Sequence, residues 1–112
     1  MSDFAVQQET CHRFGAAFRA YDKMEKVGIA LETLSELPLN ALRVTPVGGV
    51  SGWYIWGGDY SAASDFFSPL HIAHLEDYCG LIIPYLGLAP GWRLQLAPGH
   101  EDVWFDENTA NE

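Results

Sequence analysis

The sequence predicts an α+β fold in which one antiparallel sheet of about four strands is covered by an N-terminal helix and a short helical pair. Three observations indicate this fold: a helical stripe of apolar side chains over residues 3–22, a strongly strand-forming segment at 52–57, and two alternating C-terminal segments joined by a short turn. A chain of 112 residues, 48% of them hydrophobic, has room for one core. We therefore expect residues 1–112 to form a single domain.

The N-terminal segment, residues 1–25, is predicted to consist mainly of one helix. Its large apolar side chains recur at intervals of seven, three, four and three residues: Phe4, Cys11, Phe14, Phe18 and Tyr21. These intervals place all five on one stripe of a helix, with most polar residues outside the stripe. We expect this stripe to pack on the sheet.

The next segment, residues 26–32, alternates between apolar side chains and polar or small ones, as a half-buried strand does. A helix that continues from Asp22 is the alternative, because Ala, Leu, Glu and Lys are good helix formers, but Gly28 favours the strand. Residues 33–50 contain two prolines and two glycines, which predict a long loop with room for a short edge strand at residues 42–44.

The middle of the chain is predicted to contain a central strand followed by helices. Residues 52–57, GWYIWG, are apolar on both faces, as in a strand that is covered on both sides. After a loop, Ser68 and Pro69 predict a helix start, because a hydroxyl cap is followed by proline. Gly80 and Pro84 interrupt the helical spacing that follows, so two short helices are expected there.

The C-terminal part is predicted to be a β-hairpin. Residues 92–96 alternate between apolar and polar side chains, Pro98 and Gly99 make a turn, and residues 102–106 alternate again. So short a connection favours antiparallel pairing of the two strands. Residues 107–112 are polar and are predicted to be a frayed tail.

The charge of the chain argues against two classes of partner. The formal net charge is −9, from 15 acidic and 6 basic residues, whereas binding to nucleic acid or to anionic membranes needs an excess of Lys and Arg. The charge is uneven, because residues 45–112 contain nine acidic residues and one basic residue, Arg93. The acidic half either forms a solvated surface that aids solubility or produces an electrostatic field that steers a basic partner onto it.

The N-terminus lacks the basic and apolar regions of a secretory signal, and no apolar run approaches the ~20 residues of a membrane span. The expected location is therefore the cytoplasm, where Cys11 and Cys79 would be reduced thiols.

No set of residues predicts catalysis, and we expect neither a cofactor nor a metal ion. His71 and His74 lie three residues apart beside acidic side chains, but two imidazoles need a third ligand from elsewhere to hold a metal. A small enzyme or a ligand- or metal-binding domain that uses His71 and His74 is the alternative function.

Aromatic side chains set among carboxylates predict a protein-binding surface. Tyr60 follows Asp59, and Trp104 lies between Asp102 and Asp106. Tyr and Trp anchors among acidic groups are typical of a site that receives an Arg- or Lys-rich protein surface. The predicted partner-binding residues are Asp59, Tyr60, Glu101, Asp102, Trp104, Asp106 and Glu107. A homodimer built on the aromatic side chains is a further alternative.

Four segments, which together run from Lys26 to Asp106, resemble a known family: KVGIALETLSELPLNALR, SGWYIWGGDYS, DFFSPLHIAHLEDYC and IIPYLGLAPGWRLQLAPGHEDVWFD. The family is that of the bacterial immunity proteins called immunity protein 33-like. Its members are cognate antidotes of polymorphic toxins, including those of contact-dependent and type VI secretion systems. The resemblance implies a protein that binds a toxin and blocks it without catalysis, and it supplies no catalytic residues. If that toxin is a nuclease with a basic surface, an acidic antidote could occupy this surface by mimicking phosphate charge.

Overall fold

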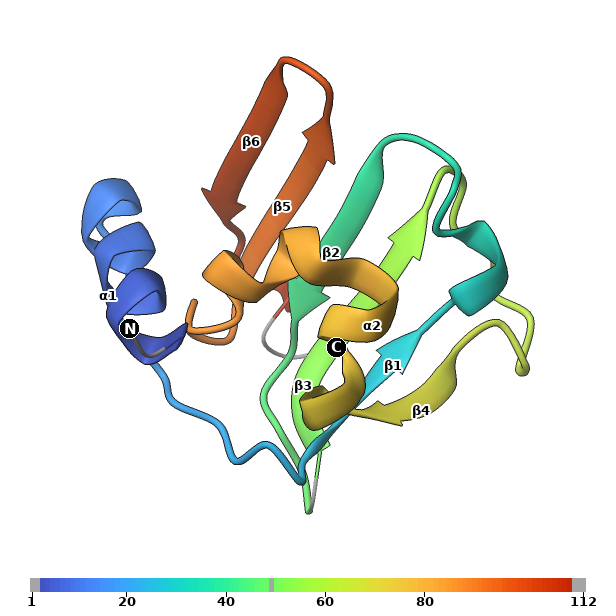
Figure 1. The fold of residues 1–112 in the computed structure, drawn as a ribbon, viewed down its shortest axis with the longest axis horizontal. Helices are drawn as coiled ribbons and strands as arrows, with labels where there is room; N and C mark the ends of the chain where they lie inside the picture. Colours follow the sequence, from blue (N-terminus) through green and yellow to red (C-terminus); the bar gives the residue numbers. More distant parts are fainter. Residues whose placement is uncertain (1–2, 49, 110–112) are drawn as a thin grey trace.

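The computed structural model describes residues 3–48 and 50–109 and confirms an α+β fold (Figure 1). Its helices and strands are α1 (Asp3–Phe14), β1 (Lys26–Ile29), β2 (Leu39–Arg43), β3 (Val50–Gly57), β4 (Ser68–His71), α2 (Glu76–Cys79), β5 (Trp92–Ala97) and β6 (His100–Phe105). Three 3-10 helices complete the fold: η1 (Leu31–Thr33), η2 (Ile72–His74) and η3 (Gly80–Tyr85).

The sheet is larger than expected and is mixed. Its order is β4-β1-β3-β2-β5-β6, so it has six strands where about four were predicted. β1 and β3 run parallel, and the other neighbouring pairs are antiparallel. The prediction of a purely antiparallel sheet was therefore wrong. The chain reverses direction from β1 to β2 and again from β2 to β3, so β1 and β3 run the same way. They are neighbours because β2 pairs on the far side of β3 from β1.

β2 is the largest departure from the predicted loop at residues 33–50. This strand lies between β3 and β5, and all five of its residues are buried. Its sequence, LNALR, shows no polar and apolar alternation because both of its faces are covered. One of the buried residues is Arg43, whose side chain is only 1% exposed.

α1 ends earlier than the predicted helix at residues 3–22. Gly15 has φ 70°, the left-handed conformation that commonly follows the last turn of a helix. The N–H of Ala16 donates to the carbonyl of Cys11 at 2.8 Å, and that of Gly15 donates to His12 at 3.2 Å, which together form a Schellman motif. The residues that follow, through Phe18, continue the apolar stripe but lie outside the helix.

Ser68 and Pro69 begin a strand and not the predicted helix. β4 pairs only with β1, at the edge of the sheet, where a proline can stand because its missing N–H costs no ladder hydrogen bond. The helical region that follows is broken into η2, the four-residue α2 and η3. The predicted interruption is present at Gly80, because Cys79 before it has the non-helical angles φ −153° and ψ 68°. Pro84, in contrast, lies inside η3 and does not interrupt it.

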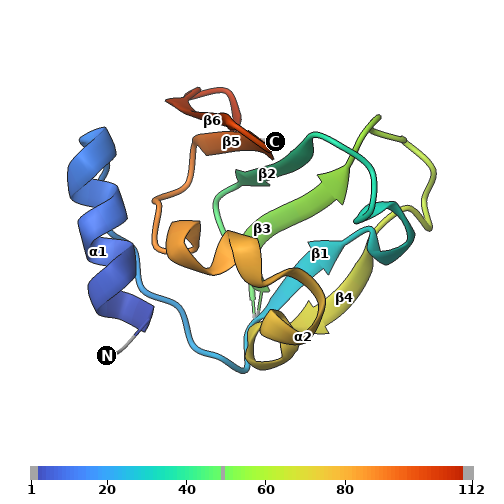
Figure 2. The same cartoon turned by 45° about the horizontal axis from the view of Figure 1, so that its top comes forward.

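The sheet has one face covered by helical segments and one face without them in the described part of the chain. α2 and the helical turns after it lie over the covered face, and α1 stands beside them (Figures 1 and 2). The main core lies under these segments and includes Val27, Ile55, Leu75, Ile82 and Leu94. No helix among the described residues is long and apolar enough to cross a membrane.

The C-terminal hairpin forms as predicted. β5 and β6 are joined by Pro98 and Gly99, and their six paired positions are in antiparallel register. The predicted frayed tail begins instead with an ordered turn, because Thr109 is fully buried and its N–H donates to the carbonyl of Asp106 at 3.0 Å. The rest of the predicted tail, residues 110–112, lies outside the described residues.

Candidate functional site

We call the face of the sheet without helical cover the outer face. Across five strands, Gly28, Tyr54, Leu42, Arg93 and Trp104 are successive register partners. Directly opposite residues of neighbouring strands point to the same face, so these five positions form one row. A second row on this face runs through Trp56, Asn40, Gln95 and Asp102.

Five aromatic side chains gather on the outer face, and we call them the aromatic cluster: Tyr54, Trp56, Tyr60, Phe66 and Phe67. The last three belong to the segment between β3 and β4, which folds back over the sheet. The ring centroids of Tyr60 and Trp56 are 5.5 Å apart, and those of Tyr54 and Phe67 are 5.1 Å apart, both in edge-to-face geometry. Such contacts fix the rings in place and leave part of their surface open.

Three adjoining hollows follow the outer face. The central hollow has a volume of about 660 Å³ and is lined by Leu42, Val44, Tyr54, Trp56, Tyr60, Phe67 and Arg93. A second hollow of about 370 Å³ shares Val44, Tyr54 and Phe67 with it. A third, of about 340 Å³, shares Trp56, Tyr60 and Arg93 with it. Because neighbouring hollows share these lining residues, we call the three together the trough.

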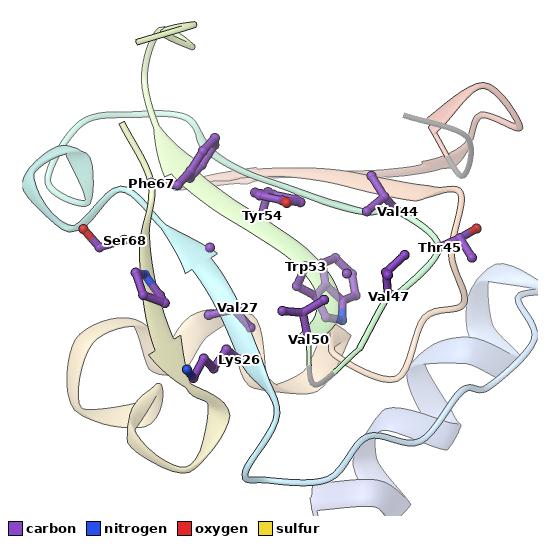
Figure 3. Close-up of a pocket in the computed structure, with 13 residues that line it drawn as sticks. Lys26, Val27, Val44, Thr45, Val47, Val50, Trp53, Tyr54, Phe67 and Ser68 are labelled. Carbon is purple, nitrogen blue, oxygen red and sulfur yellow. The ribbon is translucent and has the colours of Figure 1, made fainter. Parts of the chain in front are cut away.

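The second hollow is shown in Figure 3, where Tyr54 lies between Phe67 on one side and Val44 on the other. Gly28 of β1 makes room for this arrangement. A Cβ atom at this position would lie 2.7 Å from Cδ1 of Tyr54, closer than van der Waals contact allows. The glycine that marked this strand in the sequence thus lets the tyrosine ring lie across it.

Four of the predicted partner-binding residues come together on the outer face. Asp59, Tyr60 and Trp104 line the third hollow. Asp102 is the register partner of Gln95, which lines the same hollow. Tyr60 is 61% exposed, so its ring is available to a partner although it contacts the aromatic cluster.

Glu101, in contrast, lies on the covered side of the sheet. Its register partner is Leu96 of the core face, and its carboxylate accepts two hydrogen bonds from Arg13 of α1, both at 2.9 Å. The hydroxyl of Tyr85 donates to the same carboxylate. Arg13 and Tyr85 hold the pKa of Glu101 below its usual value, while burial, with the neighbouring carboxylate, raises the pKa of Tyr85 to about 12. Glu101 therefore joins α1 to the hairpin.

Asp106 and Glu107 follow the end of β6. The N–H of Asp106 donates to the carbonyl of Gly91 at 2.9 Å, and its carboxylate accepts a hydrogen bond from the N–H of Asn108 at 3.0 Å. The Asp106 carboxylate thus takes part in the turn that brings Thr109 into the structure.

Sequence reasoning did not assign Tyr54, Trp56, Phe67 and Arg93 to a binding surface, although they line the trough. The strand at 52–57 was expected to be covered on both faces, which is partly correct, since Trp56 is buried in a small cluster with Ala30 and Leu42. The signal that could have found Arg93 is its isolation, because it is the one basic residue of an acidic half.

The residues of the alternative function do not assemble into a metal site among those that the structure describes. The rings of His71 and His74 are 6.3 Å apart, but no group of three or more His, Cys, Asp or Glu that could hold a metal ion is present in residues 3–48 and 50–109. Cys11 and Cys79 are buried, and burial raises the pKa of both thiols, which disfavours the reactive thiolate.

A further apolar groove, of about 740 Å³, lies on the helical side between η3 and the hairpin. Exposed Leu37, Tyr78 and Leu81 line it, and Leu81 is 73% exposed. Its rim holds His100 and Glu101, so it combines apolar walls with a carboxylate that is already paired.

A family model described as the Imm33-like domain matches residues 6–106, which confirms the resemblance seen in the sequence. No curated protein and no solved structure matches the chain.

Proposed function

The chain belongs to the Imm33-like family, and from this membership we propose that it is an immunity protein that binds a toxin and blocks it without catalysis. The toxin docks on the outer face of the sheet, over the trough. Blocking is by occlusion, because a protein seated on the toxin keeps substrate from its active site. The interaction takes place in the cytoplasm, against a toxin delivered by a secretion system or against the cell's own copy.

The observation that carries this proposal is the combination of open aromatic rings and hollows on one face. Tyr54 is 36% exposed and Tyr60 is 61% exposed, and both line the central hollow. Tyr and Trp side chains that fill or border pockets supply most of the binding energy of many protein interfaces. The outer face therefore has the composition of an interface centre.

The charge around the trough indicates the chemistry of the partner. Asp59 lines the third hollow, and Asp102 lies on β6 opposite Gln95, which lines the same hollow. The net charge of the chain is −9. A toxin surface rich in Lys and Arg would be attracted to this face and oriented by it. Such a surface is expected of a nuclease, whose substrate site must bind phosphate groups.

The proposal is tested by pairing the protein with its toxin and then changing the outer face. Tagged protein is recovered from the cells that naturally make it, a stoichiometric partner is identified, and co-expression is tested for rescue of cells that express that partner. Tyr60→Ala and Trp104→Ala are each expected to weaken binding about tenfold or more. Leu81→Ala, in the groove on the helical side, is the matched control and is expected to bind as the unchanged protein does.

Two outcomes contradict the proposal. Failure of the partner to harm cells, or failure of this protein to rescue them, contradicts the immunity function. If Leu81→Ala loses rescue while Tyr60→Ala and Trp104→Ala keep it, the result contradicts the proposed docking face. Circular dichroism of each variant confirms that it is folded.

The acidic rim is tested by association kinetics. Asp102→Asn is expected to slow association with the toxin and to reduce its dependence on salt, because the rim charge steers the encounter. Glu76→Gln, which removes the same charge from α2 on the other side, is the control. Equal rates for both variants would mean that net charge and not this face governs association.

A further inference from the structure

Arg93 stands in the middle of the acidic outer face and is the one basic residue in positions 45–112. It lies on β5 between its register partners Leu42 and Trp104, and it lines both the central and the third hollow. The attraction of a basic partner does not explain why a cation lies at the centre of a surface with an acidic rim.

The side chain of Arg93 is held in place by its surroundings. Its guanidinium carbon lies 5.9 Å from the ring centroid of Trp104, within the range of a cation–π contact. One of its nitrogens, Nη1, donates to the hydroxyl of Thr109 at 3.3 Å. Thr109 is fully buried, so the ordered turn after β6 serves to hold this guanidinium.

The charge of Arg93 is not paired within the described part of the chain. The salt bridge that the structure contains there joins Arg13 to Glu101 on the other side of the sheet. Arg43, the other arginine of the sheet, directs its donors to four backbone carbonyls inside the core. Arg93 therefore differs from both, because it keeps guanidinium donors available at the two hollows that it lines.

The central hollow defines which ligand these donors fit. Its other lining residues are four aromatic and two aliphatic side chains. A mainly apolar pocket with one fixed charged group binds a molecule that has an apolar body and one complementary charge. Guanidinium groups pair with carboxylates through two parallel hydrogen bonds, so the complementary group is a carboxylate next to an apolar group.

We propose that Arg93 receives the carboxylate of an Asp or Glu side chain of the toxin, while an apolar side chain beside it enters the central hollow. This inference rests on the proposed function and adds to it. The toxin surface would then carry basic residues opposite Asp59 and Asp102, and one acidic residue opposite Arg93. A toxin without that acidic residue would leave the guanidinium desolvated and unpaired, which makes Arg93 a determinant of specificity.

The site is first tested without the toxin, with 3-phenylpropanoate as the probe and 3-phenylpropanamide as its neutral match. Both are titrated while the NMR signals of the Trp104 and Trp56 indole N–H groups are followed at constant ionic strength. The carboxylate is expected to shift these signals to saturation, and the amide is expected to bind about tenfold more weakly or not at all. Arg93→Gln should remove the preference for the carboxylate over the amide. Arg19→Gln, which removes an exposed cation distant from Arg93 in the sequence, should keep it.

Equal binding of the carboxylate and the amide, or an unchanged preference in Arg93→Gln, would overturn the assignment of Arg93 as a carboxylate receptor. The toxin then separates this inference from the proposed function. Loss of toxin affinity by about tenfold or more in Arg93→Gln, but not in Arg19→Gln, supports both. Full rescue and unchanged affinity in Arg93→Gln overturns the inference and leaves the immunity function standing. Probe binding through Arg93 in a protein that neutralises no toxin overturns the toxin as occupant and assigns the hollow to small carboxylates.

Discussion

Replacing Arg43 by Met is expected to destabilise the protein strongly, although the two side chains have similar lengths and Met is well suited to a buried site. Arg43 lies in β2, 1% exposed, with its guanidinium carbon 5.7 Å from the ring centroid of Trp53. Its donors reach four backbone carbonyl oxygens at 2.9 to 3.2 Å: those of Ser51, Arg19, Leu86 and Leu88. These carbonyls belong to separate parts of the chain, so one side chain joins β2 to β3, to the segment after α1 and to the segment after η3.

The size of the effect follows from two opposing contributions. All four carbonyls lose their charged donor in Arg43→Met. The carbonyl of Leu86 keeps a hydrogen bond from the Trp53 indole at 3.0 Å, so the loss counts fully for the other three. Each such loss in a buried site costs about 2 kcal/mol, or about 6 kcal/mol in all. Burial lowers the pKa of Arg43 to about 10, and removal of this unfavourable charge returns about 3 kcal/mol. The net loss of unfolding free energy is therefore about 3 kcal/mol.

Urea unfolding followed by tryptophan fluorescence measures this loss. With a urea m-value of about 1.5 kcal/mol/M, the midpoint is expected to fall by about 2 M. Arg19→Met, which removes an exposed guanidinium, is the control and should change the midpoint little. A loss below about 1 kcal/mol in Arg43→Met would refute the reasoning, because the carbonyls would then have found other partners at no cost.

Two further changes test the local structure. Glu101→Gln should lower the unfolding free energy by about 1 kcal/mol at pH 7, since it weakens the exposed pair with Arg13. The folded pKa of Glu101 is lowered, so this contribution exists at neutral pH and disappears as the pH falls through that lowered pKa; equal losses at pH 7 and pH 2 would contradict it. Gly15→Ala should cost about 1 kcal/mol, because φ is 70° there, whereas Gly80→Ala, at φ −62° with open space around it, should be neutral or stabilising. Thermal unfolding of the two glycine variants checks this, and equal effects would show that the Schellman motif is unimportant.

The parts of the fold that the sequence predicts well are those fixed by local patterns. The segment at 52–57 forms the middle of the sheet because Trp53 and Ile55 fill the core while Tyr54 and Trp56 cover the outer face. The hairpin of β5 and β6 follows from its alternation and from the turn at Gly99, where φ is 71°. In both places neighbouring residues alone decide the structure.

The parts that the sequence did not predict are decided by contacts distant in the chain. β2 looks like a loop because side chains on both of its faces are buried, Ala41 in the main core and Leu42 in the small cluster with Trp56, so its sequence shows no alternation. Pro69 looks like a helix start, and only the pairing of β4 with β1 makes it an edge-strand proline. Gly15, in contrast, offered a local signal, since a glycine inside an apolar stripe is a frequent helix end.

The candidate site divides in the same way. The grouping of Tyr60 and Trp104 with acidic neighbours was predicted from composition, and the fold places both at one hollow. Glu101 and Asp102 were grouped together, but successive residues of a strand point to opposite faces, and the alternation of β6 sends Glu101 to Arg13. The position of Arg93 at the centre of the trough depends on the register of β2 with β5, which one sequence does not specify.

The footprint of the bound toxin tests most directly whether the outer face is the docking surface. NMR spectra of the isotope-labelled protein, recorded with and without its unlabelled toxin, report which signals change on binding. We predict that the changes centre on Tyr54, Trp56, Tyr60, Arg93 and Trp104, with those of α1 and η3 unaffected. A footprint centred on Leu81, Tyr78 and the groove beside η3 would contradict the account, because the toxin would then dock on the opposite side of the sheet.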